Sequence, residues 1–235
     1  MASVIELFGA PGTGKSSTVR ALEGRHVAGR RIVGADRLLR VARGRPFGSL
    51  LRRDLTPGER RRELAARGQD WAGLLSIVRD APLGRDADDP LRPLHAPGWL
   101  AATLELRALA DAAPADVVVV LDEGLVQRAP IVCGADPDDE TLARYLRALP
   151  PPVLHVHLTQ DPAVLVARLR GRGRVIDRHV GLDDGRLIDS VRDDLRLLAR
   201  CAAGLAAAGA AVHTTVPREV NAVASEVLSA IEREL

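Results

Sequence analysis

The sequence predicts an α/β fold in which helices cover both faces of a parallel β-sheet, and three observations indicate it. Short apolar segments of strand length alternate along the chain with longer segments of helical periodicity. Several of these short segments, such as residues 117–121, are apolar at every position, which is typical of strands buried on both faces. A glycine-rich loop joins the first of them to the first helix. We predict five parallel strands within a single domain, residues 1–235.

The first half of the chain contains three of the five predicted strands. Val4–Phe8 is the first, and the loop Gly9–Gly14 leads from it into a helix over Lys15–Leu22. The second strand, Arg31–Val33, is short, and the third, Asp116–Leu121, is strongly apolar.

A long insert at about residues 36–97 separates the second strand from the third. Residues 36–80 have helical patterns that are interrupted near Pro46 and Pro57. Residues 82–97 are rich in proline and aspartate and predict an irregular surface loop, after which a helix resumes over Gly98–Ala112. We expect this insert to shape a specialised acceptor site.

The second half of the chain alternates helices with the last two strands. An acidic turn at residues 136–140 precedes a helix that stops at three prolines, residues 150–152. The remaining elements are, in order, a strand at 153–158, a helix at 162–170, an arginine- and glycine-rich loop at 171–179, a helix at 183–208, a strand at 211–215 and a helix from Pro217 to Leu235.

The composition is that of a globular protein. No apolar run approaches the roughly 20 residues that a membrane span requires, and the first residues lack the features of a secretory signal. We therefore expect a cytoplasmic location and no membrane partner. Cys133 and Cys201 are the only cysteines and have no metal-like spacing, so we interpret both as free thiols. His155 and His157 share one face of a strand without a third ligand and are interpreted as strand residues.

The glycine loop carries the strongest functional signal. Residues 9–16 read GAPGTGKS and fit the pattern G-x-x-x-x-G-K-[ST], in which backbone N–H groups and a helix N-terminus bind phosphate. We predict that Lys15, the only lysine of the chain, contacts the β- and γ-phosphates of ATP, and that the Ser16 hydroxyl binds magnesium. The predicted nucleotide-binding residues of this loop are Gly9, Pro11, Gly12, Thr13, Gly14, Lys15, Ser16 and Ser17.

Two acidic residues follow the third strand directly. Asp122 ends a buried apolar strand, and ligands bind at that edge of such sheets, so we predict a second magnesium ligand there. Glu123 is the next residue, and two roles are open for it. It is either a catalytic group that acts as a base or orders a water, or the cap of the following helix.

Four residues are candidates for holding the acceptor. Asp36 and Arg37 follow the second strand, where the carboxylate would accept a hydroxyl proton and the guanidinium would neutralise a phosphate; the alternative for Asp36 is a helix N-cap. Gln127 and Arg128 lie one turn beyond Glu123 and would grip the acceptor unless they belong to a surface helix. Trp71 and Trp99 either line an acceptor pocket or pack in the core.

A predicted lid at about residues 168–179 contains several arginines around two glycines. Guanidinium groups on such a segment would neutralise the charge that develops during phosphoryl transfer, and the alternative is a solvated basic loop. Arg168 and Arg172 are our choices for nucleotide binding and catalysis within this group.

With these residues placed, the whole chain resembles the small P-loop kinases of the nucleoside monophosphate kinase group, and thymidylate-kinase-like proteins most closely. Three stretches carry the resemblance: Gly9–Ser16, Val117–Arg128 and Leu158–Arg174. The resemblance implies a P-loop NTPase fold with five parallel strands, ATP and magnesium as cofactors, and transfer to an acceptor under a lid. Asp36 is similar in placement to the acceptor-binding aspartate of shikimate-kinase-like members.

The chain also departs from thymidylate kinases at two points. Those enzymes usually have Asp-Arg where this chain has Asp122 and Glu123, and their acidic-Arg-Pro-Gly segment is not found after the second strand. These departures argue against a housekeeping thymidylate kinase.

Three functions fit the sequence. The first is a kinase that transfers the γ-phosphate of ATP to a hydroxyl or phosphate of a small-molecule or nucleotide acceptor. The second is a kinase acting on a hydroxymethylated base in DNA, as in phage DNA modification, with the arginine-rich region between Arg37 and Arg67 binding the backbone. The third is a nucleotide-dependent switch or ATPase that acts through a protein partner. The sequence leaves the oligomeric state open, a dimer included.

Overall fold

The computed structural model describes residues 2–35, 37–38, 62, 65–66, 68, 70–81, 92–171, 179, 181–216 and 219–235. Most of the predicted insert lies outside these residues, as do Asp36 and the stretch 172–178 of the predicted lid. Of the arginine-rich region, only Arg37 and Arg62 fall within the described part.

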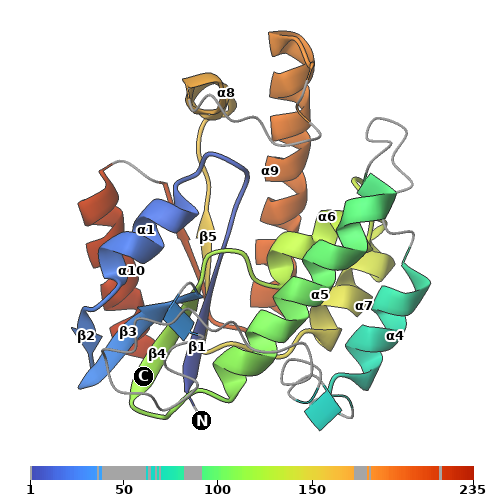
Figure 1. Ribbon diagram of the computed structural model, residues 1–235. Helices are drawn as coiled ribbons and strands as arrows, with labels where there is room; N and C mark the ends of the chain where they lie inside the picture. Colours follow the sequence, from blue (N-terminus) through green and yellow to red (C-terminus); the bar gives the residue numbers. More distant parts are fainter. Residues whose placement is uncertain are drawn as a thin grey trace.

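Six strands form one sheet in the order β2-β3-β4-β1-β5-β6 (Figure 1). Five of them run parallel: β1 (Ser3–Phe8), β3 (Arg30–Gly34), β4 (Val117–Leu121), β5 (Leu154–Leu158) and β6 (Val212–Thr215). β1 lies between β4 and β5, so the loop that follows β1 emerges at the middle of the sheet.

The prediction of five strands is wrong by one. The additional strand, β2 (His26–Val27), runs antiparallel to β3. Ala28 and Gly29 connect the two strands and have φ values of 48° and 75°, as a two-residue hairpin turn requires. A strand of two residues is too short for a periodic signal, and alanine is an uncommon residue at a positive φ. The sequence therefore gives little warning of this hairpin.

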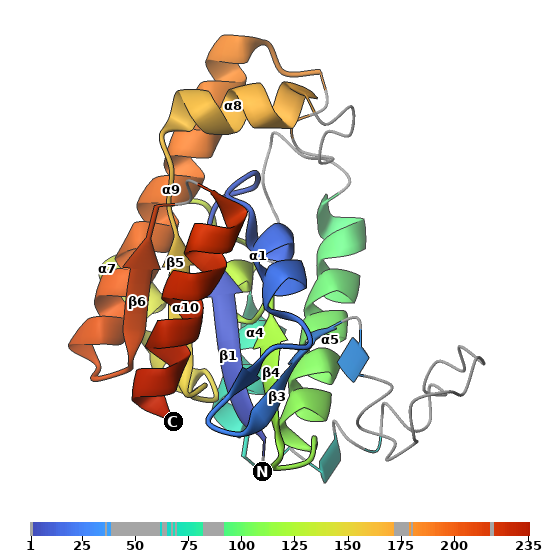
Figure 2. The ribbon, with the colours of Figure 1, turned by 90° about the vertical axis from the view of Figure 1, so that its left-hand side faces the viewer.

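Helices cover the sheet on both faces, as predicted, and one further helix lies beyond one end of the strands. α1 (Lys15–Leu22) and α10 (Val220–Glu234) pack together on one face. The other face carries α4 (Ala72–Asp80), α5 (Arg92–Asp111), the short η1 (Val126–Arg128) and α6 (Ala129–Val132), α7 (Asp139–Ala148) and α9 (Asp184–Ala207). In both views α8 (Pro162–Gly171) lies beyond the end of the sheet at which the glycine loop emerges (Figures 1 and 2).

The alternating side chains of β1 enter two different cores. Ile5 and Leu7 point toward α1 and α10 and are completely buried there. Phe8 points to the opposite face, into the core formed by α4, α5, α7 and α9. Glu6 shares that face and is also buried, although it is charged. Glu6 is the only ionisable residue of β1, in which Ser3 is the other polar residue.

One predicted loop is partly helical in the structure. α5 begins at Arg92, within the segment 82–97 that the sequence predicts to be irregular, and Pro97 lies inside the helix. Pro97 removes a single N–H donor, and the helix continues on both sides of it because Leu100, Leu104 and Ala108 bury one face in the core. The other predicted elements are present where they fall on described residues, with slightly shifted ends.

Aspartate side chains cap the N-termini of two helices. Asp138 accepts a hydrogen bond from the Thr141 N–H at the start of α7, and Asp183 accepts one from the Arg186 N–H at the start of α9. Within the described part of the chain, none of the helices has the length and apolar character needed to cross a membrane.

Candidate functional site

The glycine loop occupies the turn between β1 and α1, and its glycines are required by its shape. A Cβ atom on Gly9 would lie 2.2 Å from the carbonyl oxygen of Leu158 on β5. Gly12 and Gly14 have φ values of 90° and 97°, in the region that favours glycine. Gly14 is the N-cap of α1 and provides no side-chain cap, and the first turn of α1 contains no acidic residue. The first N–H groups of α1 are thus suited to an anion.

Lys15 follows this loop as the first residue of α1 and is 8% exposed. Its ammonium donates hydrogen bonds to the carbonyl oxygens of Gly9 and Ala10, at 2.7 and 3.3 Å. These contacts fold the side chain back over the loop. The only lysine of the chain is therefore at the centre of the predicted phosphate site.

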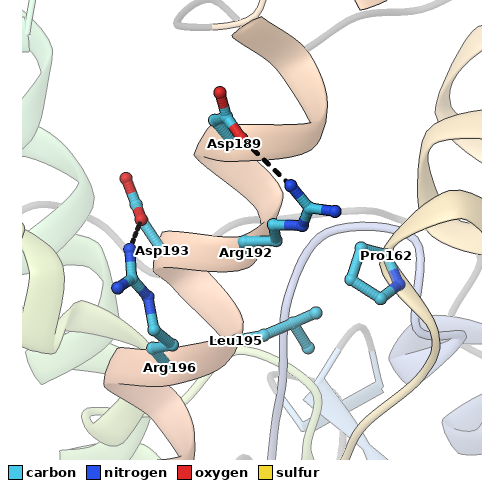
Figure 3. A pocket seen from close by; sticks show the side chains of 6 residues that line it. All are labelled: Pro162, Asp189, Arg192, Asp193, Leu195 and Arg196. Carbon is cyan, nitrogen blue, oxygen red and sulfur yellow. Dashed lines mark hydrogen bonds and ion pairs between the residues drawn. The ribbon is translucent and has the colours of Figure 1, made fainter. Parts of the chain in front are cut away.

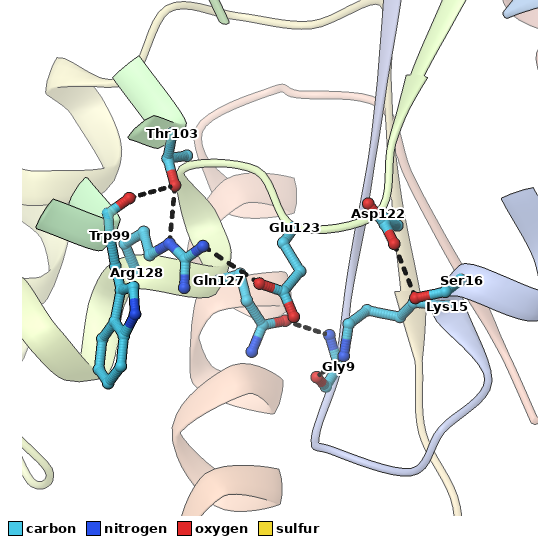
Figure 4. A network of polar contacts seen from close by, with 9 residues as sticks. All are labelled: Gly9, Lys15, Ser16, Trp99, Thr103, Asp122, Glu123, Gln127 and Arg128. Atoms are coloured by element: carbon cyan, nitrogen blue, oxygen red, sulfur yellow. Dashed lines mark hydrogen bonds and ion pairs between the residues drawn. The ribbon is translucent and has the colours of Figure 1, made fainter. Parts of the chain in front are cut away.

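Ser16 and Asp122, the two predicted magnesium ligands, are in direct contact. The Ser16 hydroxyl donates a hydrogen bond of 2.7 Å to Oδ2 of Asp122, although the two residues are 106 positions apart (Figure 4). A hydroxyl and a carboxylate are hard oxygen ligands, and Mg²⁺ typically takes one or two carboxylates together with waters and phosphate oxygens. These two residues therefore fit magnesium. Among the described residues, no group of three or more His, Cys, Asp or Glu side chains is arranged to hold a metal by itself.

α8 packs directly on the glycine loop. Ala10 forms a small buried cluster with Leu165 and Leu169 of α8, and a Cβ atom on Gly12 would come within 3.4 Å of Leu165. Arg168 extends from the same helix, and its Nη1 donates to the carbonyl oxygen of Gly12 at 3.3 Å. The structure thus brings Arg168 to the loop that it was predicted to serve. Arg172 lies outside the described residues.

The segment between β4 and α6, residues 122–128, lies against the glycine loop and forms one wall of the site. Gln127 accepts a hydrogen bond from the Gly9 N–H at 3.0 Å. Arg128 donates to the Thr103 hydroxyl at 2.8 Å and pairs with Glu123 at 3.1 Å. The residue that precedes η1 is Leu125, so Glu123 does not cap this helix and instead forms an ion pair within the site. The capping alternative for Glu123 is therefore wrong.

The two tryptophans have different environments. Trp71 is 4% exposed and belongs to the core beneath α4 and α5. Trp99 is 38% exposed and lies in α5, where its carbonyl oxygen accepts a hydrogen bond from Thr103. Figure 4 shows Trp99, Thr103 and Arg128 on one side of Gly9, and Asp122 and Ser16 on the other. Trp99 thus lies in the turn of α5 that contacts Arg128 through Thr103, whereas Trp71 is a core residue.

Sequence reasoning missed a buried polar group beneath this wall. Glu6 is 1% exposed, and its Oε1 accepts a hydrogen bond of 2.6 Å from the Val126 N–H. Burial raises the pKa of Glu6 from 4.5 to about 6, and the Arg107 guanidinium, the Val126 N–H and the Arg128 guanidinium limit the rise. The signal was visible in the sequence, because a charged residue within an apolar strand is seldom buried without a specific partner.

His155 and His157 are buried strand residues next to Phe8. The rings of Phe8 and His157 are stacked with their centres 5.0 Å apart, and His155 meets Phe8 edge-on at 6.2 Å. Burial lowers the pKa of His155 to about 4, with a smaller contribution from Arg107, and burial also lowers the pKa of His157. Both imidazoles are consequently neutral near pH 7.

A shallow pocket lies between the start of α8 and α9 (Figure 3). Arg192 pairs with Asp189 at 3.3 Å, and Arg196 pairs with Asp193. Exposed pairs of this kind contribute little to stability, and their charges cancel. Neither the glycine loop nor Asp122 lines this pocket, so we assign no phosphate to it. Its lining residues are Pro162, Asp189, Arg192, Asp193, Leu195 and Arg196.

The remaining predicted acceptor residues are only partly described. Asp36 lies outside the described residues. Arg37 is described and forms an ion pair of 3.1 Å with Glu23, the residue after α1. The structure thus brings together the glycine loop, Asp122, Glu123, Gln127, Arg128 and Arg168.

Comparisons with known proteins find similar chains among solved structures. No protein-family model matches the sequence, and no curated protein shows a significant match. Among solved structures, the chain is similar to a herpesvirus thymidine kinase, EHV4-TK complexed with TP5A, with 18% sequence identity and a TM-score of 0.45. The match covers 99% of this chain and 95% of that chain. A likeness of this strength decides neither family nor activity.

Proposed function

We propose that the protein is an ATP- and magnesium-dependent kinase that transfers the γ-phosphate to a hydroxyl or phosphate group of a small-molecule or nucleotide acceptor. The observation that carries this proposal is the 2.7 Å contact between Ser16 and Asp122. It joins the residue after the loop lysine to the end of the neighbouring strand, at the carboxyl edge of a parallel sheet where phosphate ligands bind. The proposal rests on this geometry together with the glycine loop.

Each residue around the glycine loop has a role that follows from its chemistry. Backbone N–H groups of the loop and of the first turn of α1 would bind the phosphates, and the Lys15 ammonium would exchange its two carbonyl partners for phosphate oxygens. Ser16 and Asp122 would hold Mg²⁺, which neutralises charge on the β- and γ-phosphates. Arg168, which contacts the Gly12 carbonyl oxygen, would add a further positive charge.

The wall formed by residues 122–128 is the side on which we place the acceptor. Glu123 is 55% exposed at its side chain and is oriented by Arg128, so it is available to accept a proton from an acceptor hydroxyl. Gln127 already contacts Gly9, which keeps this wall next to the phosphate site. Asp36 remains the alternative base. Catalysis in such a site comes mainly from positioning and charge neutralisation.

The test is a transfer assay with γ-labelled ATP and magnesium. The protein is incubated with separate pools of nucleosides, nucleoside monophosphates, small hydroxylated metabolites and DNA that carries hydroxymethylated bases. We expect the label to enter one of the three small-molecule pools, and we expect Lys15→Met and Asp122→Asn to abolish the transfer. Arg192→Gln, on the exposed surface of α9, is the matched control and should keep the activity.

Two other outcomes would contradict the proposal. Label that appears only as inorganic phosphate in every pool indicates an ATPase or a switch that acts through a partner. Transfer that persists in Lys15→Met would place the active site elsewhere. Labelled DNA would instead identify the base-modifying alternative, and its binding should weaken steeply with salt.

A further inference from the structure

The buried carboxylate of β1 lies directly beneath the wall that carries the predicted acceptor residues. We propose that Glu6, together with Tyr145, is a positioning residue that fixes the segment 122–128 against the glycine loop, so that Glu123, Gln127 and Arg128 face the transferred phosphate. This inference rests on the proposed kinase function. Neither Glu6 nor Tyr145 lies in the P-loop pattern at residues 9–16.

The first support is the fit between Glu6 and the segment above it. Its Oε1 accepts the Val126 N–H at 2.6 Å, a short bond to a buried acceptor. A Cβ atom on Gly124 would lie 2.1 Å from Cδ of Glu6, so only glycine allows the backbone to come this close. The segment is therefore built around this carboxylate and would have to move if a different side chain occupied the position.

The second support is a matching anchor from α7. Tyr145 is completely buried, and its hydroxyl donates a hydrogen bond of 2.6 Å to the carbonyl oxygen of Leu125. Glu6 thus accepts from one residue of the segment while Tyr145 donates to the preceding residue. Two anchors on adjacent residues restrain both the position and the orientation of the backbone at this point.

The third support is the arrangement of charge around Glu6. Arg107 from α5 and Arg128 from η1 both act on Glu6 as favourable positive charges. His155 on the neighbouring strand β5 is the register partner of Glu6, and Tyr145 faces Glu6 from α7. Arg128 also pairs with Glu123 and therefore connects the buried carboxylate to the exposed one.

The functional consequence follows from the order of contacts along the segment. Val126 is fixed by Glu6, Gln127 is the next residue and reaches the Gly9 N–H, and Arg128 then orients Glu123. Loss of the anchor would let these three side chains shift while the glycine loop itself keeps its structure. Misplacement of a reacting group by about 1 Å can lower a rate by about 100-fold.

The experiment compares three variants with a control. Glu6→Ala removes the acceptor, Glu6→Gln keeps an acceptor oxygen of the same size, and Tyr145→Phe removes only the hydroxyl. Val227→Ala is the control, because Val227 is equally buried but lies in the core on the opposite face of the sheet. Amide hydrogen exchange of the peptide that contains residues 122–128 is measured by mass spectrometry, together with MgATP binding and transfer kinetics.

We expect faster exchange of that peptide in Glu6→Ala and in Tyr145→Phe, and no change in Val227→Ala. For phosphate transfer, kcat should fall by about 10- to 100-fold in Glu6→Ala, while the KM for ATP should change by less than about threefold. Glu6→Gln should restore most of the kcat. Tyr145→Phe, the milder change, keeps the test informative if Glu6→Ala does not fold.

The outcomes separate this inference from the proposed function. Unchanged exchange in both Glu6→Ala and Tyr145→Phe, or kcat values equal to that of Val227→Ala, would overturn the positioning role while the kinase stands. A wild-type protein that binds MgATP but transfers phosphate to no acceptor would overturn the proposed function. The exchange data would then still decide whether Glu6 and Tyr145 hold the segment.

Discussion

The absence of a Cβ atom at Gly9 allows the glycine loop to pack against β5. The Gly9 Cα approaches the Leu158 carbonyl so closely that a methyl group at this position would overlap backbone, which cannot move aside as a flexible side chain would. Gly9 also donates its N–H to Gln127. A change at this residue therefore affects both the sheet edge and the acceptor wall.

We expect Gly9→Ala to lower the melting temperature and to abolish MgATP binding, because the loop must shift to relieve the overlap with Leu158. Gly73→Ala is the comparison, since Gly73 lies in α4 and an added Cβ has no neighbour within 4 Å. It should be neutral or stabilising by up to about 1 kcal/mol. Thermal denaturation and MgATP titration of both variants check this, and equal behaviour would contradict the steric argument.

The raised pKa of Glu6 predicts how stability depends on pH. Because the folded protein holds the Glu6 proton more tightly than the unfolded chain does, this contribution stabilises the fold below pH 4.5 and is lost as the pH rises through 6. A rise from 4.5 to about 6 corresponds to about 2 kcal/mol. Denaturant unfolding of wild type and Glu6→Gln at several pH values should show that the advantage of the wild type declines across this interval.

The lowered pKa of His155 predicts a pH dependence of stability that is opposite in sign to that of Glu6. Its pKa is lowered from 6.5 to about 4, so its contribution is present above pH 6.5 and is lost as the pH falls through 4. In the same unfolding experiments, the stability of wild type relative to His155→Gln should therefore increase with pH by about 3 kcal/mol. A pH-independent difference for either variant would show that its group does not titrate as its burial implies.

At the scale of elements, the prediction succeeded where a segment is long and periodic. The parallel strands and α1, α8 and α9 were predicted from apolar runs and helical spacing, and the structure confirms them. The hairpin strand β2 was missed because two residues carry no period. The start of α5 was missed because proline and aspartate at residues 82–97 outweighed the burial of its apolar face, which only the tertiary structure reveals.

We expect Pro97 to lower the stability of α5. Its ring provides no N–H for the helix, so we expect Pro97→Ala to increase the free energy of unfolding by up to about 3 kcal/mol. Gly98→Ala in the same helix removes only backbone freedom and should contribute about 1 kcal/mol. Denaturant unfolding of both variants tests this order, and a destabilised Pro97→Ala would mean that the proline has a structural role.

At the scale of the whole molecule, the candidate site joins parts of the chain that are far apart. The glycine loop and Asp122 were predicted individually because each follows an apolar strand, and the structure brings them together at the centre of the sheet. The anchors at Glu6 and Tyr145 were not predicted, because their partners are backbone groups elsewhere in the chain. The partner of Glu6 is 120 residues away and that of Tyr145 is 20 residues away. Contacts of side chains with distant backbone leave no periodic pattern in a sequence.

A ligand that joins distant segments should stabilise the entire fold. We expect MgATP at about 100 times its Kd to add about 2.7 kcal/mol to the free energy of unfolding, because it binds only the folded protein. Thermal denaturation with MgATP, with magnesium alone and with Lys15→Met measures this effect. An equal shift in Lys15→Met would mean that the nucleotide binds away from the glycine loop.

The scarcity of lysine has a practical consequence for this protein. Apart from the amine at the start of the chain, the Lys15 side chain is the only primary amine, and it is 8% exposed within the glycine loop. Reagents that modify amines therefore meet a single side-chain target, and acetylation there would remove the charge on which the phosphate site depends. The extent of such labelling becomes a direct measure of how accessible the loop is, without any engineered probe.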